Sequence, residues 1–238
     1  TDKFCRTMAE NQNTSSQEIE ILYEDNHIIA VNKQARQIVQ GDNTGDKPLS
    51  DILKSYIKER DHKPGNVFLG VPHRIDRPVS GVVLFAKTSK ALTRLSELFR
   101  TKDAHKTYLA VVGNKPPKDS DTLVDYIYRN VKQNKSYVVD EKHPEAKRSS
   151  LSYKVVGHSE RYYLLEIDLH TGRHHQIRCQ LANIGCPIRG DLKYGYPRSN
   201  KNGGINLHAA RITFTHPVKK EEIVIEAPFP DEKIWKIF

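Results

Sequence analysis

Short apolar runs separated by polar turns make up most of the hydrophobic pattern of this chain. Residues 20–32 hold two such runs on either side of Glu24-Asp25-Asn26-His27, a pattern that predicts a β-hairpin. Further runs of strand length lie at residues 81–87, 107–112, 136–139, 151–156, 162–169, 209–214 and 223–227. Because several of these runs follow one another without a helical segment between them, we expect an α+β fold with a largely antiparallel sheet.

Three other segments place apolar side chains at helical spacing. Residues 48–58 form the first of these segments. The second continues through residues 92–99 after Thr88-Ser89, whose hydroxyl groups can cap a helix N-terminus. Residues 177–184 form the third. Residues 114–121 are polar and contain two prolines, so we expect a connection there.

The composition is that of a folded protein with an extensive polar surface. The chain has 238 residues, of which 37% are hydrophobic and 28% are charged. Residues 1–18 are polar and are expected to form a flexible arm, which leaves residues 19–238 as the folded domain. No stretch approaches the ~20 apolar residues of a membrane span, the N-terminus does not resemble a signal peptide, and the three cysteines do not suggest a disulfide framework. We therefore expect a cytoplasmic protein.

The charge balance is basic. Lysine and arginine total 38 against 29 acidic residues, which gives a formal net charge of +9. Such a charge attracts polyanions, but a merely basic protein would have the same balance. Charge alone therefore leaves nucleic-acid binding open, and the motifs must decide.

The densest concentration of reactive side chains lies in residues 73–81, which read His-Arg-Ile-Asp-Arg-Pro-Val-Ser-Gly. A single carboxylate, Asp76, stands between two guanidinium groups and just before an apolar strand. The proline and the glycine indicate a shaped turn, where functional residues are often found. The alternative is a charge cluster that neutralises itself on a surface loop.

A second basic segment, residues 170–178, reads His-Thr-Gly-Arg-His-His-Gln-Ile-Arg and leads into the third helix. Helix N-termini attract anions, so phosphate is the expected ligand, although a solvated basic helix start is the alternative. A zinc site is less favoured because no CxxC or HExxH spacing is present. Its candidate ligands would be His170, His174, His175 and Cys179. Motifs for dinucleotides, P-loop nucleotides and nucleophile-elbow hydrolases are also missing from the sequence.

Together the two segments resemble the RluA-type pseudouridine synthases, whose pattern is His-Arg-Leu-Asp-Arg-x-x-Ser-Gly followed by a strand. Residues 106–113, Lys-Thr-Tyr-Leu-Ala-Val-Val-Gly, supply a further block in the family's order. The resemblance extends over residues 21–229 and includes Gly190-Asp191 before Tyr194-Gly195. Departures are small, such as Ile75 where leucine is usual. There is no room before Ile19 for the S4 domain of many relatives, so RNA recognition is expected mostly from the catalytic domain.

The resemblance implies a mixed, mostly antiparallel sheet in two halves with flanking helices and a central RNA-binding cleft. It also implies isomerisation of uridine to pseudouridine in structured RNA, ribosomal or transfer, without a cofactor or a metal. Asp76 matches the catalytic carboxylate, which either attacks the sugar carbon or removes a sugar proton. Arg178 matches the arginine that pairs with this carboxylate, so we expect it to favour the ionised form of Asp76. Tyr108 matches the tyrosine that lies against the target base.

The same resemblance assigns the RNA contacts. Arg74 matches the arginine that enters the stack vacated by the flipped uridine, a step that costs a few kcal/mol. The remaining candidates for backbone or pocket contacts are His73, Arg77, Lys33, Lys106, Arg173 and His175.

Two other functions stay open at this point. One is an RNA-binding protein without turnover, against which the intact catalytic positions argue. The other is a glycoside or nucleoside hydrolase, which usually needs a second carboxylate or a metal. The sequence does not identify the modified uridine or the oligomeric state.

Overall fold

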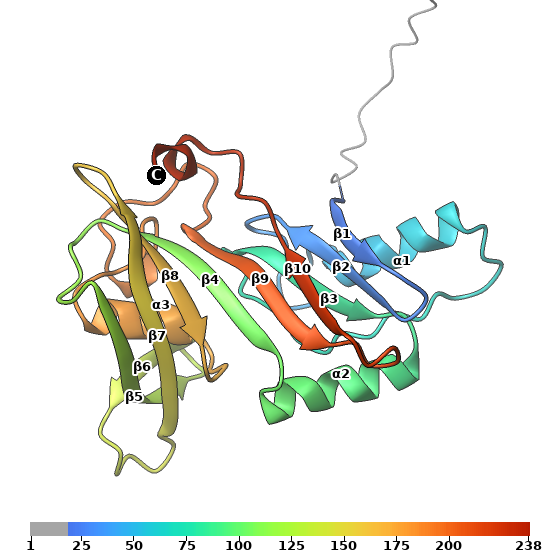
Figure 1. Ribbon diagram of the computed structural model, residues 1–238, viewed down its shortest axis with the longest axis horizontal. Helices are drawn as coiled ribbons and strands as arrows, with labels where there is room; N and C mark the ends of the chain where they lie inside the picture. Colours follow the sequence, from blue (N-terminus) through green and yellow to red (C-terminus); the bar gives the residue numbers. More distant parts are fainter. Residues whose placement is uncertain (1–18) are drawn as a thin grey trace, which may run out of the picture.

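The computed structural model describes residues 19–238, in which ten strands form one sheet with flanking helices (Figure 1). The arm expected at residues 1–18 lies outside the described residues. The strands are β1 (Ile21–Glu24), β2 (Ile28–Lys33), β3 (Ser80–Ala86), β4 (His105–Val112), β5 (Ser120–Asn130), β6 (Lys135–Val139), β7 (Lys147–His158), β8 (Tyr163–Leu169), β9 (Leu207–Thr215) and β10 (Glu222–Glu226). The α-helices are α1 (Leu49–Arg60), α2 (Ser89–Thr101) and α3 (Gln176–Asn183), and the 3₁₀ helices are η1 (Leu192–Tyr194) and η2 (Lys233–Ile237).

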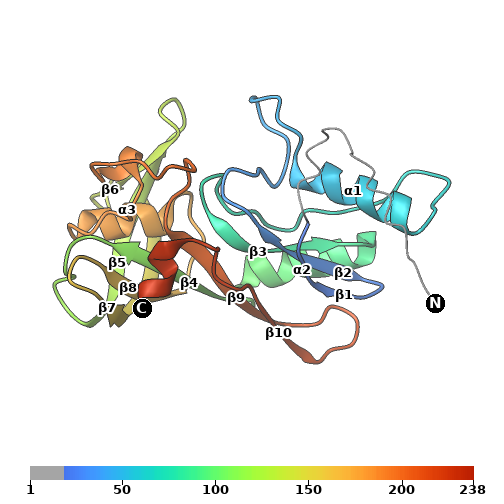
Figure 2. The ribbon, with the colours of Figure 1, turned by 90° about the horizontal axis from the view of Figure 1, so that it is seen from above.

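The sheet is mixed and mostly antiparallel, as expected. Its strand order is β1-β2-β3-β9-β4-β8-β7-β5-β6, and β10 also pairs with β9. Among the pairs of named strands in residues 19–238, only β3 and β9 run parallel. Figure 2 shows β1 to β3 with α1 and α2 on one side of the molecule, β5 to β8 with α3 on the other, and β4 and β9 between them.

The parallel junction between β3 and β9 joins the two halves over a short length, in which Ser80 pairs with His208 and Gly81 pairs with Ala209. Gly81 has φ +119, and a Cβ at this position would lie 2.2 Å from the carbonyl oxygen of Ala209. Only glycine therefore allows the two backbones to approach so closely. The Ser80 hydroxyl and His208 Nδ1 are 2.8 Å apart across the same junction.

Cores form on both faces of the sheet. One face packs against α1 and α3, with Leu53 and Leu181 fully buried, and the other packs against α2 through Leu95. Both faces of β2 and β3 are covered in this way, which explains why these strands are continuous apolar runs.

Most predicted elements are confirmed within a few residues. Thr88 caps α2, since its side chain accepts a hydrogen bond from the Ala91 N–H at 3.1 Å. The connection expected at residues 114–121 is wrong at its end, because β5 begins at Ser120. Only Leu123 and Ile127 of β5 are buried, so the strand lacks the alternation that would have revealed it. Its regular structure depends instead on pairing with β6 and β7 on either side.

Candidate active site

The loop that precedes β3 presents Asp76 to the interface of the two halves. The Asp76 carbonyl accepts a hydrogen bond from the Val79 N–H at 3.0 Å, which closes a turn containing Pro78. The side chain of Ile75 is buried beneath the loop. These contacts hold the backbone while leaving the Asp76 side chain 32% exposed.

Asp76 lines a cavity of about 320 Å³ that combines residues from both halves. The loop before β3 supplies one wall, and β4, β5 and the start of α3 supply the others. The polar and charged residues among its lining are Arg74, Asp76, Lys106, Tyr108, Arg129, Arg173, His174, His175, Gln176 and Arg178. The cavity therefore carries several cationic groups around one carboxylate.

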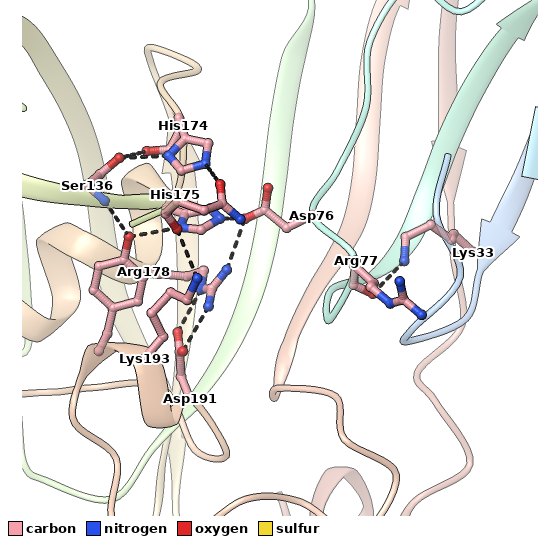
Figure 3. A network of polar contacts seen from close by, with 11 residues as sticks. Lys33, Asp76, Arg77, Ser136, His174, His175, Arg178, Asp191 and Lys193 are labelled. Atoms are coloured by element: carbon pink, nitrogen blue, oxygen red, sulfur yellow. Dashed lines mark hydrogen bonds and ion pairs between the residues drawn. The ribbon is translucent and has the colours of Figure 1, made fainter. Parts of the chain in front are cut away.

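Arg178 lies beside Asp76, as expected. Its Nη1 is 3.5 Å from Asp76 Oδ2, while its Nε and Nη2 contact the two oxygens of Asp191 at 2.7 and 2.9 Å (Figure 3). Both Arg178 and Asp191 are buried. The bidentate pair with Asp191 fixes the guanidinium plane, so that Nη1 stays directed at Asp76.

Burial changes the expected ionisation of Asp76. Loss of water raises the pKa of Asp76 above its ordinary value, and the positive charges of Arg178 and Lys33 oppose this rise. The Arg178 guanidinium thus lowers the pKa of Asp76, as expected. The net shift of this pKa is nevertheless upward, opposite to the one we expected. The anion of Asp76 depends on its neighbours, because the partly buried carboxylate has lost some of the water that would stabilise it.

Tyr108 projects from β4 into the same cavity and is 8% exposed. Its hydroxyl has no hydrogen-bond partner among residues 19–238, so a ligand in the cavity can reach it. Burial and the nearby Asp76 raise the pKa of Tyr108 above its ordinary value. The hydroxyl is therefore protonated at neutral pH.

Four of the predicted RNA contacts line the cavity, namely Arg74, Lys106, Arg173 and His175. The Lys106 ammonium lies 4.9 Å from the centroid of the Phe99 ring, and it has no ion-pair partner within the described part of the chain. Burial lowers the pKa of Lys106 to about 8. Arg173 reaches the carbonyl of Arg148 at 3.2 Å.

Lys33 lies elsewhere than expected. It is fully buried, and its ammonium donates to the carbonyls of Gln34, Gln37 and Arg77 at 3.0, 2.7 and 3.0 Å. Burial lowers the pKa of Lys33 to about 7. With all three donors engaged, the group ties the end of β2 to the Asp76 loop and is not available to a phosphate.

Arg77 and His73 also point away from the cavity. Arg77 pairs with Asp46, and Figure 3 shows it with Lys33 on the far side of the loop from Arg178. His73 Nε2 accepts the Leu84 N–H at 2.9 Å, and its ring stacks on Phe99 at 4.4 Å. Both therefore support the loop in this structure rather than line the site.

The alternative zinc ligands are not gathered into a site. Among residues 19–238, no group of three or more histidine, cysteine, aspartate or glutamate side chains is arranged to hold a metal ion. His170 contacts Ser150 through Nδ1 at 3.0 Å, while the His174 and His175 rings stack on each other at 3.7 Å.

Sequence reasoning missed three residues of the site. Arg129 comes from β5, the strand that the pattern did not reveal. Asp191 and Tyr194 were noticed only as parts of a family block, yet they contact Arg178 and His175. Their signal was the Gly190-Asp191 and Tyr194-Gly195 spacing, which gave no indication of their partners.

Residues 27–183 match the family described as RNA pseudouridylate synthase. The chain belongs to this family. This pseudouridine synthase is therefore an isomerase that acts on uridine in RNA. Within residues 19–238, no helix has the length and apolar character needed to cross a membrane.

Individual relatives agree with the assignment. The ribosomal large subunit pseudouridine synthase C of Escherichia coli O157:H7 is 35% identical over 222 residues, which cover 89% of this chain and 66% of that protein. The tRNA pseudouridine synthase C of Vibrio parahaemolyticus is 30% identical over 232 residues, which cover 90% of this chain and 92% of that protein. Among solved structures, human RNA pseudouridylate synthase domain containing 4 has a TM-score of 0.75 at 23% identity, with 89% of both chains covered. This structural likeness supports the fold.

Proposed function

We propose that this pseudouridine synthase isomerises uridines of structured RNA, ribosomal or transfer, with Asp76 as the catalytic carboxylate. The observation that carries the proposal is the position of Asp76 in the cavity, beside Arg178 at 3.5 Å. Among the residues that line this cavity, Asp76 is the only carboxylate. Residues 19–238 would form the catalytic domain.

The chemistry follows from the cavity's contents. The target uridine leaves its stack and enters the cavity, where Asp76 either attacks the sugar carbon or removes a sugar proton. Arg178 keeps the carboxylate ionised. The ring of Tyr108 stacks on the base, and its hydroxyl helps to move the proton from C5. The isomerisation has no net redox change, so the reaction itself requires no cofactor.

The cations of the cavity are suited to the RNA backbone. Arg74, Lys106, Arg129 and Arg173 surround the carboxylate. Arg74 and Arg129 are exposed and have no ion-pair partner within the described residues. We assign phosphate contacts to these cations, and Arg74 in addition is the side chain that enters the vacated stack.

The hydrolase alternative is less well supported by the cavity. An inverting or retaining glycosidase needs two carboxyl groups on either side of the scissile bond. Asp191, the other carboxylate close to Arg178, is 1% exposed and is held by two hydrogen bonds. It has no access to a substrate.

Tritium release from RNA labelled with [5-³H]uridine tests the proposal. We expect release from ribosomal or transfer RNA with the wild-type protein, and a loss of about 10³-fold or more for Asp76→Asn and Asp76→Ala. Asp231→Asn is the matched control, because Asp231 is exposed and lies outside the cavity. Release that persists in both Asp76 variants would reject Asp76 as the catalytic group. Free uracil would indicate a hydrolase, and tight binding without release an RNA-binding protein.

A further inference from the structure

His175 occupies a constrained position at the start of α3. Its backbone is left-handed, with φ 52, and its side chain is 7% exposed. A left-handed conformation is uncommon for a residue with a Cβ and is retained where the surroundings determine it. Here the ring is stacked on His174 at 3.7 Å and meets the edge of the Tyr194 ring at 5.7 Å.

The hydrogen bonds of Tyr194 determine which nitrogen of His175 carries the proton. The Ser136 backbone N–H donates to the Tyr194 hydroxyl oxygen at 2.9 Å. The hydroxyl proton then needs an acceptor, and within residues 19–238 the one within reach is His175 Nδ1 at 2.8 Å. An accepting Nδ1 is unprotonated, so the proton of a neutral imidazole lies on Nε2.

The imidazole is neutral at physiological pH. Burial and the nearby Arg178 lower the pKa of His175 to about 2. Its Nε2 is 3.7 Å from Asp76 Oδ2, the oxygen that Arg178 Nη1 approaches at 3.5 Å. Two N–H groups therefore converge on one carboxylate oxygen, and Oδ1 is left for the substrate. Contacts of this length in a free enzyme can shorten when the substrate binds.

We propose that Tyr194 and His175 form a positioning pair for Asp76, in which the Tyr194 hydroxyl holds the Nε2–H of His175 toward the carboxylate. The pair supplies an uncharged donor that stabilises the anion and orients its free oxygen. A neutral donor does not compete for the phosphates of RNA, as a second cation would. The inference rests on the proposed role of Asp76.

A pH profile can separate this role from simple packing. Besides His175, the ionisable groups close to Asp76 include Arg178, Lys33, Asp191 and Tyr108. The same cavity is also lined by Arg74, Lys106, Arg129, Arg173 and His174. Removal of the Nε2–H leaves these groups in place, and the pKa of Asp76 then rises further because one donor to the anion is lost. The acid limb of the rate profile should therefore move to higher pH.

The tautomer can be measured in the wild-type protein, with a His175 variant used only to assign the signal. In the wild-type protein labelled with ¹⁵N-histidine, a long-range ¹H–¹⁵N spectrum identifies the protonated nitrogen of each ring, and the signal lost in a His175 variant assigns it. We expect a neutral His175 with its proton on Nε2. A proton on Nδ1, or a charged ring at neutral pH, would overturn the inference.

Single-turnover tritium release tests the consequence. Glutamine can place an amide N–H near the position of Nε2, whereas the shorter asparagine side chain does not reach it. We expect His175→Asn to lower the single-turnover rate about 10- to 100-fold with RNA affinity within about threefold, and to shift the acid limb to higher pH. His175→Gln should restore most of the rate and the position of the limb.

Equal losses in the two variants, or an unmoved acid limb in His175→Asn, would leave His175 as a packing residue and reject the proposal. Thermal unfolding of both variants shows whether they are folded. The wild-type protein and Asp76→Asn are measured alongside them. If the wild type releases no tritium, the proposed function fails, whereas the tautomer measurement still decides the arrangement of the pair.

Discussion

At the residue scale, burial sets the ionisation of the groups around the cavity. Asp76 has a raised pKa and His175 a lowered one for the same reason, since each charged form has lost water. The residue types at these positions were visible in the sequence, but the loss of water was not. Lys33 shows this most clearly. The sequence assigned this lysine to RNA, but in the structure it is buried and donates to three backbone carbonyls.

Lys106 gives the first prediction at this scale. Its pKa of about 8 means that the ammonium is charged below this pH and loses its charge as the pH rises through it. RNA affinity at fixed salt should therefore weaken between pH 7 and about 9, by an amount that Lys106→Met removes. Fluorescence anisotropy with labelled RNA measures the effect. An equal pH dependence in the wild type and in Lys106→Met would contradict a phosphate contact at Lys106.

At the element scale, the junction of β3 and β9 determines how the halves meet. The hairpin of β1 and β2 and the cap of α2 are local and were predicted from neighbouring residues. The pairing of β3 with β9 joins residues more than a hundred positions apart, and no pattern along the chain indicated it. The strand β5 was missed because apolar and polar side chains do not alternate regularly along its sequence.

Gly81→Ala tests the junction. The added Cβ would lie 2.2 Å from the carbonyl oxygen of Ala209 in a left-handed backbone region. We expect the free energy of unfolding to fall by at least about 2 kcal/mol, measured by urea denaturation. Gly65→Ala is the control, since Gly65 is exposed and a Cβ there meets nothing within 4 Å. Equal stability of the two variants would mean that the strands can separate without cost.

At the scale of the whole molecule, the fold gathers several of the basic residues around one cavity. The net charge of +9 left a merely basic protein open. The fold brings Arg74 from one half, Lys106 from the intervening strand β4, and Arg129 and Arg173 from the other half to a single cavity. We expect an RNA that enters this cavity to contact these four cations.

Salt dependence tests this arrangement. Four phosphate contacts give a slope of about −3.6 in log affinity against log salt, so affinity should fall about 100-fold between about 50 and 200 mM salt. Replacement of Arg129 by methionine should make the slope less steep by about one. Filter binding over a salt series measures both quantities. An affinity independent of salt would be inconsistent with phosphate contacts in the cavity.

The sequence by itself determined the local elements and the identity of the chemical groups. Hairpins, helices and caps depend on residues close together in the chain, and the block around Asp76 carries its resemblance in nine consecutive positions. Only the tertiary structure decided which groups meet, because Asp76 and Arg178 are 102 positions apart and Asp191 joins them from another loop. It also decided which of these groups are charged, since exclusion of water is a property of the packed molecule and not of any segment.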